Sequence, residues 1–318
     1  MEAKELCLEI PGVELASGFY RDFGRPALLS RFGPYMDRMT IGLVGEGSEC
    51  FGFDDRLSMD HDYGPSFCIW LSQDLYEEIG PAVAQTYDAL PRDYKNVSFG
   101  LRREQAAGRR GVIPTLPFYQ KFLGNRVPPE SALEWLAIPE SYLAVATNGV
   151  LFHSPDTEFV RIRKQLLDFY PEDVCKKKLA ANLVKMAHAG QVNYERMAKR
   201  EDPVAARLAL DQFIEAAIRV LYLLNKRYCP YYKWMWRGLE RLPGQYGIPA
   251  LLRSLAAGQV MNREETLALV DAVCRQMAGI LLVRGYTASQ ESFLERQAYC
   301  VAETIADPQL RNLPILMG

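Results

Sequence analysis

The spacing of hydrophobic and polar positions divides the chain into two parts with different patterns. Before residue 155, short apolar runs are interrupted by glycine and proline, which is typical of short strands that alternate with helices. From Asp156 onward, apolar residues recur with helical periodicity over long segments. We therefore expect an α+β protein, with a small mixed β-sheet flanked by helices in residues 1–155 and an all-helical domain in residues 156–318.

The first part contains three segments with the pattern of strands. Residues 39–48 (MTIGLVGEGS) indicate a strand that runs into a glycine turn, and residues 61–71 (HDYGPSFCIWL) indicate a second strand. Residues 111–118 (GVIPTLPF) form a short apolar run that suits a third strand. Between the second and third strands, apolar residues such as Leu75 and Val83 recur at i+4 spacing, which predicts a helix.

Residues 141–154 (SYLAVATNGVLFHS) allow two interpretations. Asn148-Gly149 is either the turn of a hairpin or the left-handed end of a helix that starts near Pro139. We favour the helix, followed by a short strand.

The second part is expected to contain three long helices. The clearest spans residues 203–228, where the apolar residues form one continuous stripe. Two more are predicted at about residues 262–284 and 288–306. The first of these opens at Asn262 with Glu265 three residues later, which is the pattern of a capping box.

Composition narrows the classes of function. With 37 basic and 39 acidic residues the formal charge is −2, so no overall field attracts nucleic acid, and a nucleic-acid partner is disfavoured. Seven cysteines without a CxxC pair suggest buried, reduced thiols rather than disulfides or a zinc site. The N-terminus lacks the pattern of a secretory signal, and no apolar run reaches the ~18 residues of a membrane span. We expect a soluble, cytoplasmic protein with no membrane partner.

One segment, GLVGEGSECFGFDDRLSMDHDYG, carries the pattern of a chemical site. Gly47 and Ser48 form a turn after a predicted strand, and Asp60 and Asp62 follow at i and i+2. On a strand these two carboxylates share one face, where their repulsion favours a bound cation. Two magnesium ions shared with the phosphates of a nucleoside triphosphate (NTP) satisfy such a pair, while Gly47 allows close backbone approach and Ser48 donates to a phosphate oxygen.

These residues resemble the signature of the DNA polymerase β-like nucleotidyltransferase superfamily. That signature is Gly-Ser, a helix of roughly this spacing, and Asp-x-Asp on the next strand; here it is Gly47-Ser48 and Asp60-His61-Asp62. Together with the distant segment LLNKRYCPYYKW, the chain is similar to bacterial nucleotidyltransferases with a DUF4037 C-terminal domain. The resemblance covers the chain from about residue 35 to about residue 305.

The resemblance implies roles for the matching residues. Gly47 and Ser48 would hold the β- and γ-phosphates, and Asp60 and Asp62 would bind both metal ions. A third carboxylate from a later strand normally activates the acceptor hydroxyl. The segment GVIPTLPF contains no acid, and the segment VLFHSPDTEF offers only Asp156 or Glu158.

Other residues near the motif have both structural and functional interpretations. Arg56 and Ser58 either contact phosphate or position the loop, and Arg56 also has Asp54 and Asp55 beside it as ionic partners. His61 is expected to be a hydrogen-bonded core residue on the opposite face of the strand. The run Lys176–Lys178 is expected to be a solvated helix face.

The segment NKRYCPYYKW gathers cations and aromatic rings at the end of a predicted helix. Its structural interpretation is cations at a helix C-terminus together with packed aromatics. Its functional interpretation places Lys233 on the triphosphate across a cleft between the two domains, with Tyr228 and Tyr231 lining the base or the acceptor.

The expected reaction is the transfer of a nucleoside monophosphate, most simply AMP, from an NTP to a hydroxyl acceptor with release of pyrophosphate. A small-molecule acceptor is preferred because the charge balance argues against tRNA. Two alternatives stay open: nucleotidylation of a protein, and a nucleotide-binding sensor or interaction protein that has lost turnover.

Overall fold

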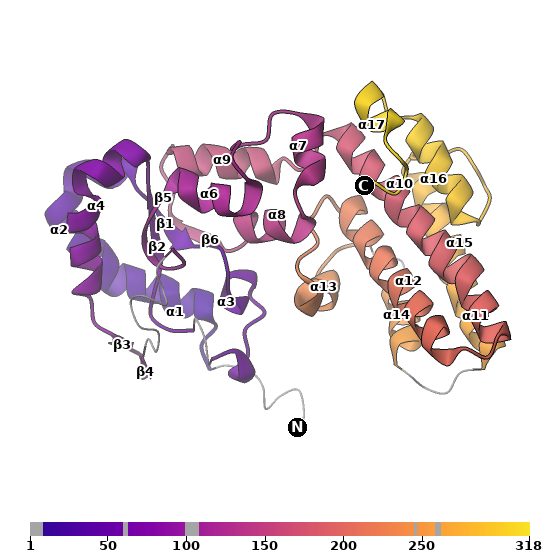
Figure 1. Ribbon diagram of the computed structural model, residues 1–318. Helices are drawn as coiled ribbons and strands as arrows, with labels where there is room; N and C mark the ends of the chain where they lie inside the picture. The colour runs from indigo at the N-terminus through magenta and orange to yellow at the C-terminus, as the bar shows by residue number, and fades with distance from the viewer. Residues whose placement is uncertain (1–8, 60–62, 99–107, 245–246, 258–261) are drawn as a thin grey trace. The chain divides into compact units, whose positions relative to one another are not determined.

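The computed structural model describes residues 9–59, 63–98, 108–244, 247–257 and 262–318 (Figure 1). The chain forms two compact units. Unit 1 contains Met1–Glu130 and Glu140–Asp168, and unit 2 contains Ser131–Pro139 and Phe169–Gly318.

The division therefore falls at 168/169, whereas the change of sequence pattern suggests a boundary near 155. The difference arises because helix α9 (Glu158–Leu167) belongs to the core of unit 1. Its Phe159 ring stacks on Trp70 of strand β2 (Cys68–Leu71), with ring centroids 4.1 Å apart.

A four-stranded mixed sheet lies at the centre of unit 1, in the order β5-β2-β1-β6. Strand β1 (Thr40–Leu43) is antiparallel to β2 and to β6 (Val150–His153), and β2 is parallel to β5 (Gly111–Pro114). The register pairs Gly42 with both Cys68 and Leu151. As a result β1 ends at the edge of the sheet where the other three strands begin, and this edge is named the turn end below. The mixed sheet confirms the expected α+β class.

Both faces of this sheet are covered by helices. On one face Ile41, Ile69 and Leu71 pack in a core with side chains of α1, α2 and α4. On the other face Trp70 contacts Phe118 of α6 as well as the α9 ring described above. The alternation of side chains along the strands explains why neighbouring residues serve opposite cores. The other elements of unit 1 are α1 (Gly12–Phe19), η2 (Tyr20–Gly24), α2 (Arg25–Phe32), η3 (Gly33–Arg38), α3 (Ser48–Phe51), η4 (Arg56–Ser58), α4 (Gln73–Asp88), β3 (Asp93–Tyr94), β4 (Val97–Ser98), α6 (Thr115–Leu123) and α8 (Glu140–Thr147).

Two predicted strands are shorter than expected. Residues 61 and 62 of the second lie outside the described residues, and its described part begins at Cys68, after a bend at Gly64 and Pro65 where proline lacks the N–H that a ladder needs. The third ends at Pro114 and the chain continues as α6, whose first turn accommodates Pro117 without losing a hydrogen bond.

The interpretation of residues 141–154 as a helix followed by a short strand is confirmed by α8 and β6. Gly149 has a φ of +69°, and a Cβ at this position would collide with the carbonyl oxygen of Leu43. Only glycine therefore allows β6 to start so close to β1.

The regular elements of unit 2 are all helices within its described residues. Helix α10 (Glu172–Met186) packs against α12 (Pro203–Leu224) and α16 (Leu294–Glu303), and α12 confirms the clearest helix predicted from the sequence. The other elements are α7 (Ala132–Ala137), η5 (Ala187–Tyr194), α11 (Glu195–Lys199), α13 (Tyr232–Leu239), α14 (Ile248–Ala256), α15 (Arg263–Val283) and α17 (Pro308–Asn312).

Helix α15 begins with the predicted capping box, in which Asn262 Oδ1 accepts from the amide of Glu265 at 2.8 Å. By length and composition it is the one helix of the described residues that is apolar enough to cross a membrane, with a mean hydropathy of 1.6 over its best window. Its buried residues, including Val273 and Leu281, pack within unit 2 as in a core helix. Helix α16 starts at Leu294, later than the expected residue 288, because Gln297 Nε2 donates to the carbonyl of Ser289 at 3.1 Å and holds a turn there.

The expectation of a solvated face at Lys176–Lys178 is wrong. Lys177 and Lys178 are only 2% and 5% exposed. The ammonium of Lys177 donates to the carbonyl of Leu313 at 2.6 Å, and that of Lys178 lies 5.3 Å from the centroid of the Tyr170 ring. Helix α10 is central to unit 2, so the aliphatic stems of both lysines are buried while their charges meet a carbonyl and a ring.

Candidate functional site

The turn that follows β1 has the unusual backbone that its glycines require. Gly45 and Gly47 adopt φ values of +119° and +116°, which residues with a side chain rarely adopt. Ser48 then begins the short helix α3, and the segment Gly45–Ser48 is named the Gly-Ser turn below. The predicted strand leading into a glycine turn is confirmed.

The first glycine of the turn is held by the side-chain amide of Asn148, which lies between α8 and β6. The N–H of Gly45 donates to Asn148 Oδ1 at 2.8 Å, and Asn148 Nδ2 donates to the carbonyl of Gly45 at 2.7 Å. The side-chain amide of Asn148 thus satisfies both backbone groups of Gly45, as the backbone of a neighbouring strand would. These two hydrogen bonds hold the backbone in place where the chain leaves β1.

A buried ion pair supports the turn from inside the protein. The carboxylate of Glu49 and the guanidinium of Arg110 form a direct salt bridge, and the two residues are 3% and 4% exposed. Arg110 also donates to the carbonyl of Glu46 at 3.4 Å. A Cβ at Gly47 would collide with the Glu49 carboxylate, so glycine is required here for space as well as for its φ.

Two buried thiols share the carbonyl groups that Arg110 contacts. Cys50 Sγ donates to the carbonyl of Glu46 at 3.3 Å, and Cys68 Sγ donates to the carbonyl of Arg109 at 3.2 Å. Burial raises the pKa of the Cys68 thiol to about 11 and also raises the pKa of Cys50. Both are therefore neutral hydrogen-bond donors rather than nucleophiles. The described cysteines are all free thiols, as the sequence suggests.

The exposed side of the turn carries a second group of charges. Glu46, between the two positive-φ glycines, accepts a hydrogen bond from the ammonium of Lys121 on α6. Its carboxylate also lies 3.8 Å from the Nε of Arg109. These three side chains are 38%, 46% and 32% exposed respectively, in contrast to the buried pair beneath them.

Several donors of the turn are open. Within the described residues, the N–H groups of Gly47 and Ser48 and the hydroxyl of Ser48 have no hydrogen-bond acceptor. All three belong to half-buried residues at the turn end of the sheet. Adjacent open backbone and hydroxyl donors of this kind can bind an anion such as phosphate.

The predicted metal ligands Asp60 and Asp62, with His61 between them, lie outside the described residues. The strand that follows them, β2, begins at the turn end of the sheet. Within the described residues no group of three or more acidic, histidine or cysteine side chains could hold a metal ion, so the described part assigns no metal site.

Arg56 and Ser58 lie on the short helix η4, between the Gly-Ser turn and the aspartates in sequence. Ser58 Oγ accepts from the amide of Asp55 at 2.7 Å and closes a capping box, while Asp54 accepts from the amide of Gly12 at 2.6 Å. Arg56 is exposed. The bonds of Ser58 are those of a residue that positions the loop.

Neither Asp156 nor Glu158 lies at the turn end. Strand β6 runs antiparallel to β1 and its last residue, His153, pairs with Ile41 near the start of β1. The hydroxyls of Thr157 and Thr40 are 2.5 Å apart at the same edge. Both acids therefore follow the strand at the edge opposite the Gly-Ser turn, which removes them as candidates for the third carboxylate.

The predicted residues of the second segment belong to unit 2. Tyr228 is 9% exposed and packs in an aromatic cluster, with ring centroids 4.9 Å from Phe169 and 5.0 Å from Tyr170. Tyr231 is 55% exposed. Lys233 is exposed and its ammonium lies 4.8 Å from the centroid of the Trp234 ring. Tyr228 thus has the contacts of a core residue, whereas Tyr231 and Lys233 are open to solvent.

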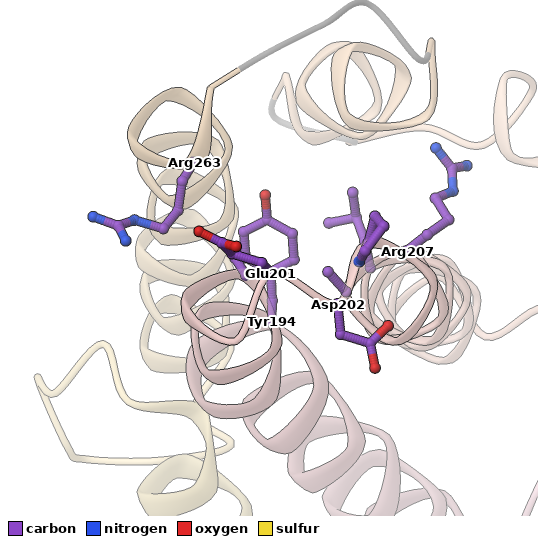
Figure 2. Close-up of a pocket in the computed structure, with 9 residues that line it drawn as sticks. Tyr194, Glu201, Asp202, Arg207 and Arg263 are labelled. Carbon is purple, nitrogen blue, oxygen red and sulfur yellow. The ribbon is translucent and has the colours of Figure 1, made fainter.

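A cavity of about 470 Å³ lies elsewhere in unit 2 (Figure 2). Its apolar lining includes Pro203 and Leu210. In Figure 2 the guanidinium groups of Arg207 and Arg263 point outward on either side of the Tyr194 ring. Arg207 is paired with Asp211 at 2.8 Å. None of the residues predicted from the sequence lines this cavity.

Sequence reasoning missed the residues that support the turn. The sequence predicts Asn148 only as part of a turn or of a helix end, and it indicates no role for Glu49 or Arg110. A signal exists for Arg110, because a charged residue directly before a buried strand is positioned to pair inside the protein. The partner of such a residue depends on the strand order, which local patterns do not encode.

Comparison with known families gives one match. Residues 135–235 match the family model described as Domain of unknown function (DUF4037). This segment includes Asn148 and the aromatic run that ends near Trp234, but it begins after the Gly-Ser turn and after Asp60 and Asp62. Comparison with curated proteins and with solved structures gave no match.

Proposed function

We propose that the protein is a metal-dependent nucleotidyltransferase. It transfers a nucleoside monophosphate, most simply AMP, from an NTP to a hydroxyl of a small-molecule acceptor and releases pyrophosphate. The observation that carries this proposal is the Gly-Ser turn. Its open N–H groups at Gly47 and Ser48, and the Ser48 hydroxyl, suit the terminal phosphates of a nucleotide.

The supports of the turn give it the rigidity that phosphate binding in a transition state requires. Asn148 fixes Gly45, and the buried pair of Glu49 and Arg110 fixes the backbone at Glu46. Donors that are already in place need no reorganisation when charge develops on the phosphates, which is how preorganised sites lower a barrier. Gly47 in turn keeps the surface of the turn free of a side chain, so an anion can approach the backbone.

Asp60 and Asp62 are the proposed metal ligands. Support comes from their spacing to Ser48 and from the topology, since β2 begins beside the end of β1. Two magnesium ions held by such carboxylates would neutralise charge on the attacking and leaving oxygens. The two carboxylates would hold these ions, and the Gly-Ser turn would hold the phosphates at the same edge of the sheet.

A small molecule is the proposed acceptor rather than a nucleic acid. The formal charge of −2 gives no general attraction for a polyanion. Tyr231 and Lys233 are exposed and remain available to contact nucleotide or acceptor, whereas Tyr228 is assigned to the core. Nucleotidylation of a protein is the alternative acceptor class.

One observation favours a second function, that of a nucleotide-binding sensor without turnover. The two acids that sequence offers for the third carboxylate, Asp156 and Glu158, follow β6 at the wrong edge of the sheet. A sensor needs the phosphate-binding turn but no group that activates an acceptor hydroxyl. The two functions share nucleotide binding and differ only in pyrophosphate release.

The test is magnesium-dependent pyrophosphate release from each of the four NTPs, with a cell metabolite extract as acceptor. The wild type is compared with the double variant Asp60→Asn/Asp62→Asn. Release by the wild type that the double variant lacks supports the transferase and names its nucleotide. Measurable ATP binding without any release supports the sensor.

A further inference from the structure

The position of Glu46 is unusual for a residue beside open anion-binding donors. A carboxylate here repels phosphate, yet the residue lies in the Gly-Ser turn itself, directly before Gly47. Its charge is met by Lys121 and by Arg109, which come from α6 and from the residues just before β5. The two cations therefore lie at the turn through their contacts with Glu46.

The charges around the Gly-Ser turn do not balance on its exposed side. Glu49 and Arg110 neutralise each other in the interior, so among the described residues the ion-paired group on the exposed side of the turn consists of one carboxylate and two cations. Exposed ion pairs of this kind contribute little to stability, because water competes with both partners. A multiply charged anion with several oxygens offers the cations a stronger partner than one carboxylate does.

We infer that Glu46 occupies the place of an anionic ligand, and that Lys121 and Arg109 pass from Glu46 to the phosphates of a nucleotide or of pyrophosphate when these bind the Gly-Ser turn. The inference rests on the proposed function for the identity of the anion. It assigns Lys121 and Arg109 to anion binding and gives Glu46 the role of a competitor that keeps both side chains in place while the turn is empty.

Substitution of Lys121 and substitution of Glu46 should change the affinity for the anion in opposite directions. Removing Lys121 deletes one charge-assisted contact to the anion and weakens binding by about tenfold. Removing the charge of Glu46 deletes the competitor and strengthens binding by about threefold, an effect on the order of that of an exposed ion pair. In the Lys121→Ala background the gain from Glu46→Gln shrinks, because the cation that Glu46 withholds is no longer there.

The experiment is calorimetric titration of the full chain with inorganic pyrophosphate in the presence of EDTA, so that no metal ion takes part. The variants are Lys121→Ala, Glu46→Gln, Glu46→Ala and the double variant Glu46→Gln/Lys121→Ala. The matched controls are Arg161→Ala and Asp156→Asn, which change an exposed ion pair of 3.4 Å near the opposite edge of the sheet. All substituted side chains are partly or largely exposed, and circular dichroism checks that each variant folds.

The expected result is weaker pyrophosphate binding by Lys121→Ala, tighter binding by both Glu46 variants, and unchanged binding by both controls. Binding by Lys121→Ala that equals that of Arg161→Ala overturns the inference. So does weaker binding by the Glu46 variants, or a wild type that does not bind pyrophosphate. Failure of the proposed function is seen separately, as absence of pyrophosphate release from NTPs by a chain that binds pyrophosphate with the expected pattern.

Discussion

Asn148 forms two hydrogen bonds with the backbone of Gly45: its Oδ1 accepts from the N–H at 2.8 Å, and its Nδ2 donates to the carbonyl at 2.7 Å. The residues are 103 positions apart in sequence. Gly149 follows directly, and its lack of a side chain lets β6 start against the carbonyl of Leu43. The Asn-Gly pair therefore joins α8 and β6 to the Gly-Ser turn.

Asn148→Ala should loosen the Gly-Ser turn. The substitution leaves the N–H and carbonyl of Gly45 without their partner, at a cost of about 1–3 kcal/mol. Hydrogen exchange measured by mass spectrometry should show faster exchange in the peptide of residues 40–50, with little change in unit 2. Asn148→Asp, which can accept but not donate, should give an intermediate loss. Unchanged exchange in both variants would mean that Asn148 does not hold the turn.

The buried pair of Glu49 and Arg110 should behave differently when one or both partners are removed. Arg110→Met leaves a buried carboxylate without its partner and should destabilise unit 1 by about 3–5 kcal/mol. The double variant Glu49→Leu/Arg110→Met should lose less stability than the single variant, because no charge is left unpaired. Urea denaturation, monitored by hydrogen exchange of the β1 amides, measures the stability of both variants. A double variant that loses as much stability as Arg110→Met, or more, would refute this account of the pair.

Lys177 should give the protein a stability that rises at alkaline pH. Burial lowers the pKa of Lys177 from its ordinary value of 10.5, so between the two values the unfolded chain binds the proton that the folded chain lacks. Stability therefore increases as pH rises through that interval, and it is lowest where the buried amine is charged. Denaturation from pH 7 to 10.5 should show this rise in the wild type and in the exposed control Lys185→Met, but not in Lys177→Met. An identical pH dependence in all three chains would exclude it.

The tyrosines of the second segment should separate into structural and binding roles. Tyr228→Ala removes a ring from the cluster with Phe169 and Tyr170 and should cost about 3–5 kcal/mol of stability. Tyr231→Ala and Lys233→Ala change exposed side chains and should alter stability by no more than about 0.5 kcal/mol. Thermal unfolding separates the three. If Tyr231 or Lys233 contacts substrate, its variant raises KM at unchanged stability, and equal KM values in all variants would remove both from the site.

The α+β class and most elements follow from local patterns. The long helices α4, α12 and α15 have continuous apolar stripes, and α15 also has its capping box, so their periodicity alone predicts them. The strands are less well defined, because the Gly64-Pro65 bend lies before the start of β2 and Pro114 is the last residue of β5, at points that apolar content does not mark. The unit boundary escapes the pattern too, since α9 is a helix like those of unit 2 but packs on the sheet.

Only part of the candidate site can be predicted from local sequence. Gly47 and Ser48 are predicted because a turn after a strand is a local feature. The roles of Arg110, Asn148 and Lys121 depend on strand order and on which helix follows β5, and neither is visible in the spacing of residues. The burial of Lys177 is also a property of tertiary packing, because the run of three lysines has the local pattern of an exposed face.

The most direct test of the central claim is to follow the label when the protein, magnesium and a metabolite extract are incubated with ATP that carries radioactive phosphorus at either the α or the γ position. Nucleotidyl transfer predicts a labelled, phosphatase-resistant product from α-labelled ATP and labelled pyrophosphate from γ-labelled ATP, both lost in Asp60→Asn/Asp62→Asn. A product labelled only from the γ position, or label in inorganic phosphate alone, would contradict the claim, because the bond broken would then be that of the terminal phosphate.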